Sequence, residues 1–265
     1  EYRMNAALEA FPKPILSVID GVTMGGGVGL TVHGSHRIAT ERTVFAMPET
    51  GIGLFPDVGA GWHLPRLRDH IGIWIALTGA QLGAADCRYA GIATHVVPSA
   101  DLPTLKSKLV ENPGDREATL APFRTADGAP PLREREREIS MAFSGSSVES
   151  ILEQLEQIDS AWARQQVAIL RTKSCMALKV TLRHMQEGAR TKTFAENMAR
   201  EYRLATRLVA SHDFHEGVRA VIIDKDQAPR WSPPALSEVT DKMLDDLFAP
   251  LTPSMEWNPL PEAGP

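Results

Sequence analysis

Three consecutive glycines stand between a strand-like run and a helix-like run, and two acidic residues follow them on a second turn-rich segment. The glycines are Gly25, Gly26 and Gly27. Glycine lets the backbone adopt a positive φ or come close to a ligand, and N–H groups at a helix start can stabilise a developing negative charge. The acidic residues are Glu49 and Asp57. An anion-stabilising turn beside two carboxylates predicts acyl or enolate chemistry.

The glycine run does not match the commonest glycine motifs. In a dinucleotide-binding fingerprint, the position of the last glycine would be Leu30 or Val32 here. No Gly-Lys-Ser/Thr follows, which excludes a P-loop, and no Gly-x-Ser-x-Gly occurs, which argues against an α/β-hydrolase serine esterase. A short glycine cluster alone is equally compatible with tight packing of a helix against a strand.

A longer pattern resembles the crotonase (enoyl-CoA hydratase/isomerase) superfamily, and within it the branch that hydrolyses 3-hydroxyisobutyryl-CoA. The resemblance implies an α/β fold, the crotonase-like ββα-superhelix (ClpP/crotonase fold), with a C-terminal helical region. The motifs that support it are Thr23-Met-Gly-Gly-Gly-Val-Gly29, Phe45-Ala-Met-Pro-Glu49, Phe55-Pro-Asp57, Ala90-Gly-Ile-Ala-Thr94, Glu201-Tyr-Arg203 and His212-Asp-Phe-His-Glu-Gly-Val-Arg-Ala220.

The resemblance implies a role for each of the chemical residues. The Gly26 amide is one donor of an oxyanion hole for a CoA thioester, and Gly25 and Gly27 let the chain turn around it. Glu49 is the retained family glutamate, acting as nucleophile or as general base on water. Asp57 contacts the substrate hydroxyl or the attacking water. The expected activity is hydrolysis of a short β-hydroxyacyl-CoA in valine breakdown.

Three further residues are implied as substrate contacts. Glu1 matches a glutamate that lines the substrate pocket, and Phe214 and Lys225 are candidates for contact with CoA. No separate cofactor and no metal are implied, since CoA arrives as part of the substrate. Lys225 could equally be solvated or paired with Asp224 or Asp226.

One departure from the family pattern bears on which reaction the protein is expected to catalyse. Two-carboxylate enoyl-CoA hydratases have a second glutamate where this chain has Gly29. Glycine cannot hold a proton, so hydration is disfavoured, although hydration or isomerisation with Glu49 as lone base stays an alternative. A third alternative is a catalytically silent binding module with this fold.

Simpler structural roles are open for the same residues. Asp57 follows a proline and could cap a helix, and Glu49 could be a solvated glutamate in a first turn. The pairs His33/His36 and His212/His215 have HxxH spacing, but no third ligand is implied, so structural histidines are favoured over a metal site.

Composition and net charge limit the kinds of partner that this chain is expected to bind. The chain has 265 residues and a net charge of −5, so no global field favours nucleic acid. Two cysteines, Cys87 and Cys175, argue against a disulfide scaffold, and no apolar run approaches the length of a membrane span. A homo-oligomer is compatible with the resemblance.

The sequence opens without Met at a point where crotonase-like domains already have strands and a first oxyanion amide. We therefore expect an N-terminal segment to be missing, and a location in bacterial cytoplasm or the mitochondrial matrix.

Periodicity divides the chain into four parts. Residues 1–110 alternate short strands, expected at 15–19, 36–40, 43–47 and 94–97, with helices at 26–33, 57–68, 71–77 and 84–90. Residues 111–132 are rich in proline, glycine and charge and predict a linker. Residues 133–230 show helical periodicity, and the proline-rich residues 231–265 predict an irregular tail.

Overall fold

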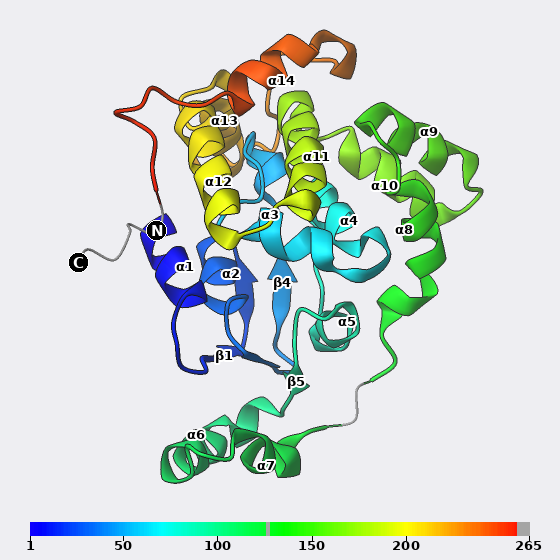
Figure 1. Ribbon diagram of the computed structural model, residues 1–265. Helices are drawn as coiled ribbons and strands as arrows, with labels where there is room; N and C mark the ends of the chain where they lie inside the picture. The colour runs from blue at the N-terminus through cyan, green and yellow to red at the C-terminus, as the bar shows by residue number, and fades with distance from the viewer. Residues whose placement is uncertain (126–127, 259–265) are drawn as a thin grey trace.

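Two small parallel sheets form the centre of the molecule. The computed structural model describes residues 1–125 and 128–258 (Figure 1). The predicted strands at 15–19, 36–40, 43–47 and 94–97 are confirmed, whereas the short strand at 22–24 was not predicted. The first sheet has the order β1 (Leu16–Ile19), β3 (His36–Ala39), β5 (His95–Val96), and the second pairs β2 (Val22–Met24) with β4 (Val44–Ala46).

The register of the second sheet places the two motif segments side by side. Met24 is the partner of Ala46 in the parallel pair β2–β4. Gly25 follows β2 immediately, and Glu49 follows β4 after two residues. Because parallel strands end at the same edge of a sheet, the glycine turn and Glu49 leave the sheet together. The crossover between these strands contains the short helix α2 (Gly26–Thr31), as a parallel pair requires.

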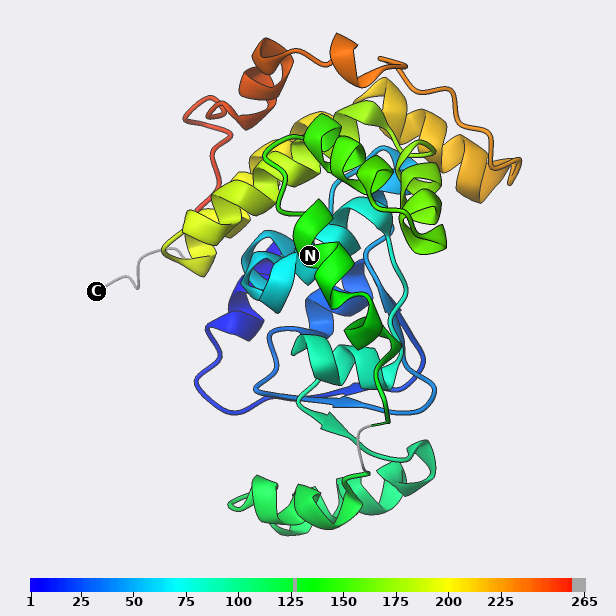
Figure 2. The ribbon, with the colours of Figure 1, turned by 90° about the vertical axis from the view of Figure 1, so that its right-hand side faces the viewer.

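Helices cover the sheets above and below (Figures 1 and 2). Those of the first half are α1 (Tyr2–Glu9), α3 (Ala60–His63), α4 (Ile71–Thr78), α5 (Ala84–Ala90), α6 (Leu102–Glu111) and α7 (Arg116–Leu120). Those of the second half are α8 (Glu136–Ala142), α9 (Val148–Gln157), α10 (Ala161–Leu170), α11 (Cys175–Arg190), α12 (Phe194–Leu208), α13 (His212–Val218) and α14 (Asp241–Phe248).

The helices α9 to α14 share one start signal. Each is preceded by a serine or threonine whose hydroxyl accepts the N–H three residues later, which satisfies one of the free N–H groups of the first turn. The caps are Ser147, Ser160, Ser174, Thr193, Ser211 and Thr240. The helical character expected for the second half is thus encoded locally, cap by cap.

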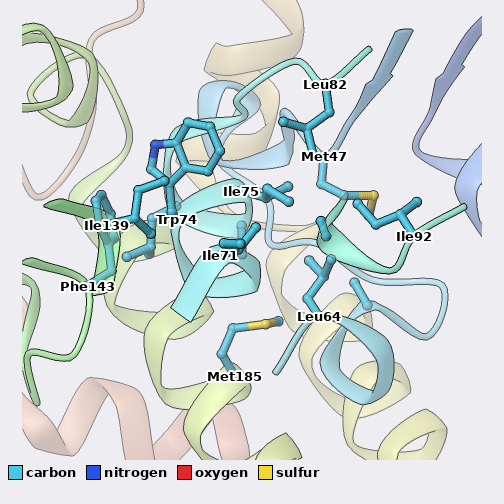
Figure 3. Close-up of a cluster of buried hydrophobic side chains, with 14 of the residues drawn as sticks. Met47, Leu64, Ile71, Trp74, Ile75, Leu82, Ile92, Ile139, Phe143 and Met185 are labelled. Atoms are coloured by element: carbon cyan, nitrogen blue, oxygen red, sulfur yellow. The ribbon is translucent and has the colours of Figure 1, made fainter. Parts of the chain in front are cut away.

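The main hydrophobic cluster joins the first half of the chain to the helices of the second. Ile71 and Ile75 of α4 are fully buried. Around them lie Met47 after β4, Phe143 after α8 and Met185 of α11, as the close-up shows (Figure 3). The helical region is therefore packed directly on the sheet region rather than appended to it.

Three of the local predictions were wrong in detail. The helix expected at 57–68 is only α3, followed by a 3₁₀ turn at Leu64–Arg66, and residues Asp69 and His70 have positive φ. The linker expected at 111–132 contains α7, because Asp115 caps it and Leu120 is buried beside Ile38. Residues 126–127 of that linker lie outside the described residues.

The irregular tail predicted at 231–265 contains α14. Its Leu244 packs with Val180 of α11 and Leu208 of α12, and Asp245 pairs with Arg183 at 2.7 Å. The prolines that suggested irregular structure flank this helix and do not interrupt it. Within the helix, the amphipathic pattern of apolar and polar residues favours the helical conformation. Residues 259–265 lie outside the described residues. None of the helices in the described ranges combines the length and the apolar character that a membrane crossing needs.

Candidate active site

Glu49 is a buried carboxyl at the start of a 3₁₀ turn. Its residue is 5% exposed, and no hydrogen-bond partner for its Oε2 lies among the described residues. Its Oε1 lies 3.6 Å from the place that a Cβ on Gly25 would take. Burial raises the pKa of Glu49 to about 8, and the charge of Asp57 raises it further, while a hydrogen bond from its own backbone opposes the rise. The carboxyl is thus poised to titrate near neutral pH.

Asp57 is the second carboxyl of this region. Tyr2 in α1 donates its hydroxyl to Asp57 Oδ2 at 2.6 Å. Burial raises the pKa of Asp57 to about 7, the charges of Glu201 and Glu1 add to the rise, and the Tyr2 hydroxyl opposes it. Both carboxyls therefore have a pKa far above that of a solvated acid, and the charge of Asp57 contributes to the rise at Glu49.

The glycine turn begins α2 beside these carboxyls. Gly25 has φ 51° and ψ −123°, a conformation that side chains disfavour. Gly26 is the first residue of α2, so its N–H has no acceptor within the helix. Glu1 lies against it: its Oε1 is 2.5 Å from the place of a Cβ on Gly26. A side chain at position 26 would displace the Glu1 carboxylate.

A fully buried carboxylate holds the segment that follows Asp57. Glu201 of α12 is 0% exposed. Its Oε2 accepts the Gly59 N–H at 2.8 Å, and its Oε1 accepts the Gly61 N–H at 3.2 Å and the Asn197 side-chain amide at 2.8 Å. Val58, between Asp57 and Gly59, has φ 52°, which a β-branched residue adopts only at a cost of about 1–3 kcal/mol. Glu201 thus fixes a strained turn next to Asp57.

A cavity of about 470 Å³ opens at Glu49. Its walls come from the glycine turn, from the 3₁₀ turn after β4, and from two segments of the second half of the chain. Those far segments contribute Lys173, before α11, and the stretch after α13 that includes Val221, Gln227 and Pro229. The cavity therefore lies between the sheet region and the C-terminal helices.

Lys173 is a half-buried cation in this wall. Its Nζ lies 3.3 Å from the place of a Cβ on Gly51, two residues beyond Glu49. Burial lowers the pKa of the Lys173 ammonium. No carboxylate partner for Lys173 lies among the described residues. Gly51 leaves room for this side chain, which gives the cavity a hydrogen-bond donor close to Glu49.

The structure gathers most of the predicted site residues. Glu1, the glycine triplet, Glu49 and Asp57 all meet at the edge of the second sheet, although they span more than fifty positions of sequence. The simpler roles weighed for the carboxyls are wrong. The cap of α3 is Gly59 and not Asp57, and Glu49 is buried rather than solvated.

The two candidates for contact with CoA lie outside the cavity wall. Neither Phe214 nor Lys225 is among the lining residues, although Val221 and Gln227, on either side of Lys225 in the sequence, are. The backbone of Phe214 instead packs on Gly53, and Lys225 is exposed. Of the two simpler roles weighed for Lys225, the structure shows the solvated one, because Asp224 and Asp226 both bind Arg219, at 2.7 and 2.6 Å. The CoA contacts of these two residues stay a prediction.

Two residues of this region were not predicted. Tyr2 and Lys173 both stand in stretches of sequence without a motif. Glu201 belongs to one of the motifs behind the resemblance, Glu201-Tyr-Arg203, but its partners 140 positions earlier were not visible in sequence.

The packing around Gly29 explains the absence of a second glutamate. A Cβ on Gly29 would lie 2.7 Å from Val58 Cβ and 2.8 Å from Asn5 Nδ2. Asn5 also donates to the Gly29 carbonyl at 3.0 Å. The space that a hydratase glutamate would need is filled, so the departure at this position is built into the packing.

The two HxxH pairs do not form metal pairs. His36 interacts with Ser35 at 2.9 Å and stacks on His95. In the other pair, His212 and His215 each face a backbone carbonyl. His33 contacts Glu9 of α1 and His63 of α3, at 3.3 and 3.2 Å.

The chain belongs to the enoyl-CoA hydratase/isomerase family, whose model matches residues 1–248. The superfamily resemblance drawn from the motifs is thereby confirmed. Among its relatives, 3-hydroxyisobutyryl-CoA hydrolase, mitochondrial, of Rattus norvegicus is 47% identical, and the protein of that name from Homo sapiens is 45% identical. Each alignment covers 95% of this chain and 67% of the relative.

Solved structures confirm the predicted fold class. The crystal structure of a carnitinyl-CoA dehydratase from Mycobacterium thermoresistibile matches with a TM-score of 0.91 at 35% identity, over 99% of this chain and 74% of that one. An enoyl-CoA hydratase from Rhodobacter sphaeroides 2.4.1 matches with a TM-score of 0.83 at 40% identity, over 95% and 73% of the two chains.

Proposed function

We propose that this protein hydrolyses a short β-hydroxyacyl-CoA thioester, namely 3-hydroxyisobutyryl-CoA, to the free acid and CoA, a step of valine breakdown. Two findings support the proposal: the relatives that share 45–47% identity are named for this activity, and Glu49 lies buried beside Gly25 in the wall of a cavity. The second observation carries the chemistry, because a buried carboxylate with a free oxygen can attack or deprotonate.

The glycine turn would stabilise the charge that forms on the thioester oxygen. Attack on the carbonyl carbon moves an electron pair onto that oxygen. The Gly26 N–H, free of intrahelical bonds at the start of α2, is the donor that we assign to it. One preorganised donor of this kind is typically worth about 3–4 kcal/mol of transition-state stabilisation.

Glu49 can act by either of two routes. As nucleophile, its carboxylate forms a bond to the carbonyl carbon, the C–S bond breaks, and water then hydrolyses the mixed anhydride. As general base, it takes a proton from a water molecule that attacks the carbon directly. Both routes end with the CoA thiolate taking up a proton, and both need ionised Glu49. Because its pKa is about 8, ionisation of Glu49 should raise kcat/KM with pH up to about 8, and ionisation of Asp57 should add a second step to the profile near pH 7.

Asp57 is the second proton-handling group in the proposal. With a pKa of about 7, both of its protonation states are populated near neutral pH. It can therefore accept a hydrogen bond from the substrate hydroxyl or pass a proton to the leaving thiolate. The bond from Tyr2 fixes one of its oxygens and leaves the other for the substrate.

Lys173 extends the site toward the second half of the chain. We propose that its ammonium binds an oxygen of the CoA moiety where the CoA arm passes through the cavity. Its half-buried position without a carboxylate partner supports this role, since such a cation gains most from an oxygen ligand. The neighbouring Gln227 would line the same path.

Hydration of an enoyl-CoA is the second candidate, because the structural neighbours include an enoyl-CoA hydratase and a carnitinyl-CoA dehydratase. The filled space at Gly29 argues against it, since a second carboxylate has no room there. The two activities have different readouts, which one experiment separates.

The test measures release of free thiol from 3-hydroxyisobutyryl-CoA, beside crotonyl-CoA and acetyl-CoA. We expect fast release from the hydroxyacyl thioester, a loss of at least about 100-fold in Glu49→Gln, and a marked loss in Asp57→Asn. Circular dichroism and thermal unfolding would show that both variants are folded. Hydration of crotonyl-CoA without thiol release, or unchanged turnover in Glu49→Gln, would refute the proposal.

The setting of the activity follows from the relatives. They are named as mitochondrial proteins, and we propose the mitochondrial matrix for this chain if its source is eukaryotic and the cytoplasm if it is bacterial. An acyl-CoA is the partner that the family implies. The reaction needs no separate cofactor, because CoA arrives with the substrate. A homo-oligomer and a further N-terminal segment of the same protein stay predictions.

A further inference from the structure

Three potential metal ligands meet where the helices α1, α2 and α3 end. Glu9 is the last residue of α1, His63 is the last residue of α3, and His33 follows α2 by two positions. One oxygen or nitrogen atom from each side chain lies within 4.8 Å of those of the other two. The side chain of His33 is 1% exposed and that of Glu9 is 32% exposed, so the group reaches the surface on the side of the carboxylate.

The contacts inside this cluster do not resolve into simple pairs. His33 Nδ1 lies 3.3 Å from Glu9 Oε2 and 3.2 Å from His63 Nε2. A ring nitrogen has one hydrogen or one lone pair in the ring plane, so it can serve one of these neighbours well and not both. The other nitrogen, His33 Nε2, is buried without a partner among the described residues, so no bond on that side sets the tautomer. Hydrogen bonding alone leaves this ring poorly satisfied.

The distances between these side-chain atoms fit coordination of one shared cation better than they fit hydrogen bonds within the cluster. Zinc binds histidine nitrogen and carboxylate oxygen at about 2.0–2.2 Å in tetrahedral geometry, so neighbouring ligand atoms lie about 3.3–3.5 Å apart. The observed separations of 3.3 and 3.2 Å correspond to two edges of such a tetrahedron. Two imidazoles and one carboxylate are a zinc-type donor set, whereas Mg²⁺ and Ca²⁺ prefer oxygen ligands throughout. A water molecule would complete the four ligands.

Two positive charges lie near the cluster, and both are engaged by backbone carbonyls. Arg37 and Arg66 act electrostatically on the cluster. Their guanidinium groups are turned to backbone carbonyls: Arg37 binds that of Ile92 at 2.5 Å, and Arg66 binds that of Thr191 at 3.0 Å. The helix ends themselves present carbonyl groups, whose partial negative charge favours a cation.

We propose that Glu9, His33 and His63 form a structural site for a zinc-class divalent cation. Such an ion would tie together three short helices, and each of these helices or its flanking turn supplies part of the candidate active site: Tyr2 from α1, Gly26 from α2, and Asp57 just before α3. No metal was expected from the sequence, because its histidine pairs have only HxxH spacing and these ligands come from three separate elements. The proposal does not depend on which reaction the enzyme catalyses.

The test uses tag-free protein dialysed against a chelator. Titration calorimetry with zinc chloride should give one ion per chain, and Co²⁺ should give the visible absorption bands of a tetrahedral site. Zinc should raise the melting temperature of the wild-type protein. Glu9→Gln, at a partly exposed position, and His63→Phe should each weaken zinc binding at least tenfold and abolish most of the thermal shift. His36→Gln is the control and should bind zinc as wild type does.

Two results would overturn the proposal. One is the absence of stoichiometric zinc binding to the wild-type protein. The other is equal zinc affinity in the wild-type protein and in Glu9→Gln, which would place the ion elsewhere and would leave a hydrogen-bonded cluster here. Glu9→Gln decides the question even if His63→Phe fails to fold.

Discussion

Replacing Glu201 by glutamine should disturb both the stability of the protein and the ionisation of Asp57. A glutamine that keeps its oxygen toward Asn197 and Gly61 places its NH₂ group opposite the Gly59 N–H, which now meets Oε2 at 2.8 Å. Two donors then face each other in a site that is 0% exposed. The strained turn at Val58 loses the bond nearest to it.

The size of the effect follows from these contacts. A hydrogen bond to a charged group is worth about 1.5–3 kcal/mol, and a buried N–H without an acceptor costs about 1–3 kcal/mol. We therefore expect a loss of about 3 kcal/mol in the free energy of unfolding, which lowers the melting temperature by about 6–12 °C in a chain of this size.

The same substitution should lower the pKa of Asp57. The charge of Glu201 raises that pKa toward about 7, so its removal favours ionised Asp57. As a general estimate at an effective dielectric constant of about 20, a charge on the order of 10 Å away changes a pKa by about one unit. The ionisation near pH 7 in the profile of kcat/KM should move to lower pH by about that amount.

The assay combines thermal unfolding with a pH profile of thiol release. Glu196→Gln is a matched control, because it makes the same change on the same helix at an exposed position. We expect the control to match wild type in both measurements. A melting temperature and a pH profile that are unchanged in Glu201→Gln would refute the role assigned to this carboxylate.

Three further predictions concern neighbouring contacts. Tyr2→Phe removes the donor to ionised Asp57, so the pKa near 7 should rise by about one unit in the pH profile, and an unmoved profile would contradict that bond. Gly29→Ala should cost about 1–3 kcal/mol of stability through overpacking, measured by denaturant unfolding, whereas Gly114→Ala, with open space at its Cβ, should cost little. Lys173→Met should raise KM by about tenfold or more with little change in kcat, and an unchanged KM would place the CoA arm elsewhere.

Much of the fold was predictable because its signals are local. The strands at the sheet centre follow from short β-rich runs, and the later helices follow from serine and threonine caps before periodic apolar residues. The errors arose where the local sequence pattern was weak and tertiary packing determined the conformation. Leu120 and Leu244 each complete a hydrophobic cluster, and this burial folds the predicted linker and tail into helices.

The sequence by itself determined which residues could do chemistry and to which superfamily they belong. Glu49, Asp57 and the glycine triplet are visible as types and spacings, because the turns that present them need particular residues. Tertiary structure alone decided their environment. The pKa of each carboxyl depends on burial and on Tyr2, Glu201 and their neighbours, which approach from distant parts of the chain. A pairwise electrostatic energy depends on distance and dielectric, and neither can be read until the helices have packed over the sheets.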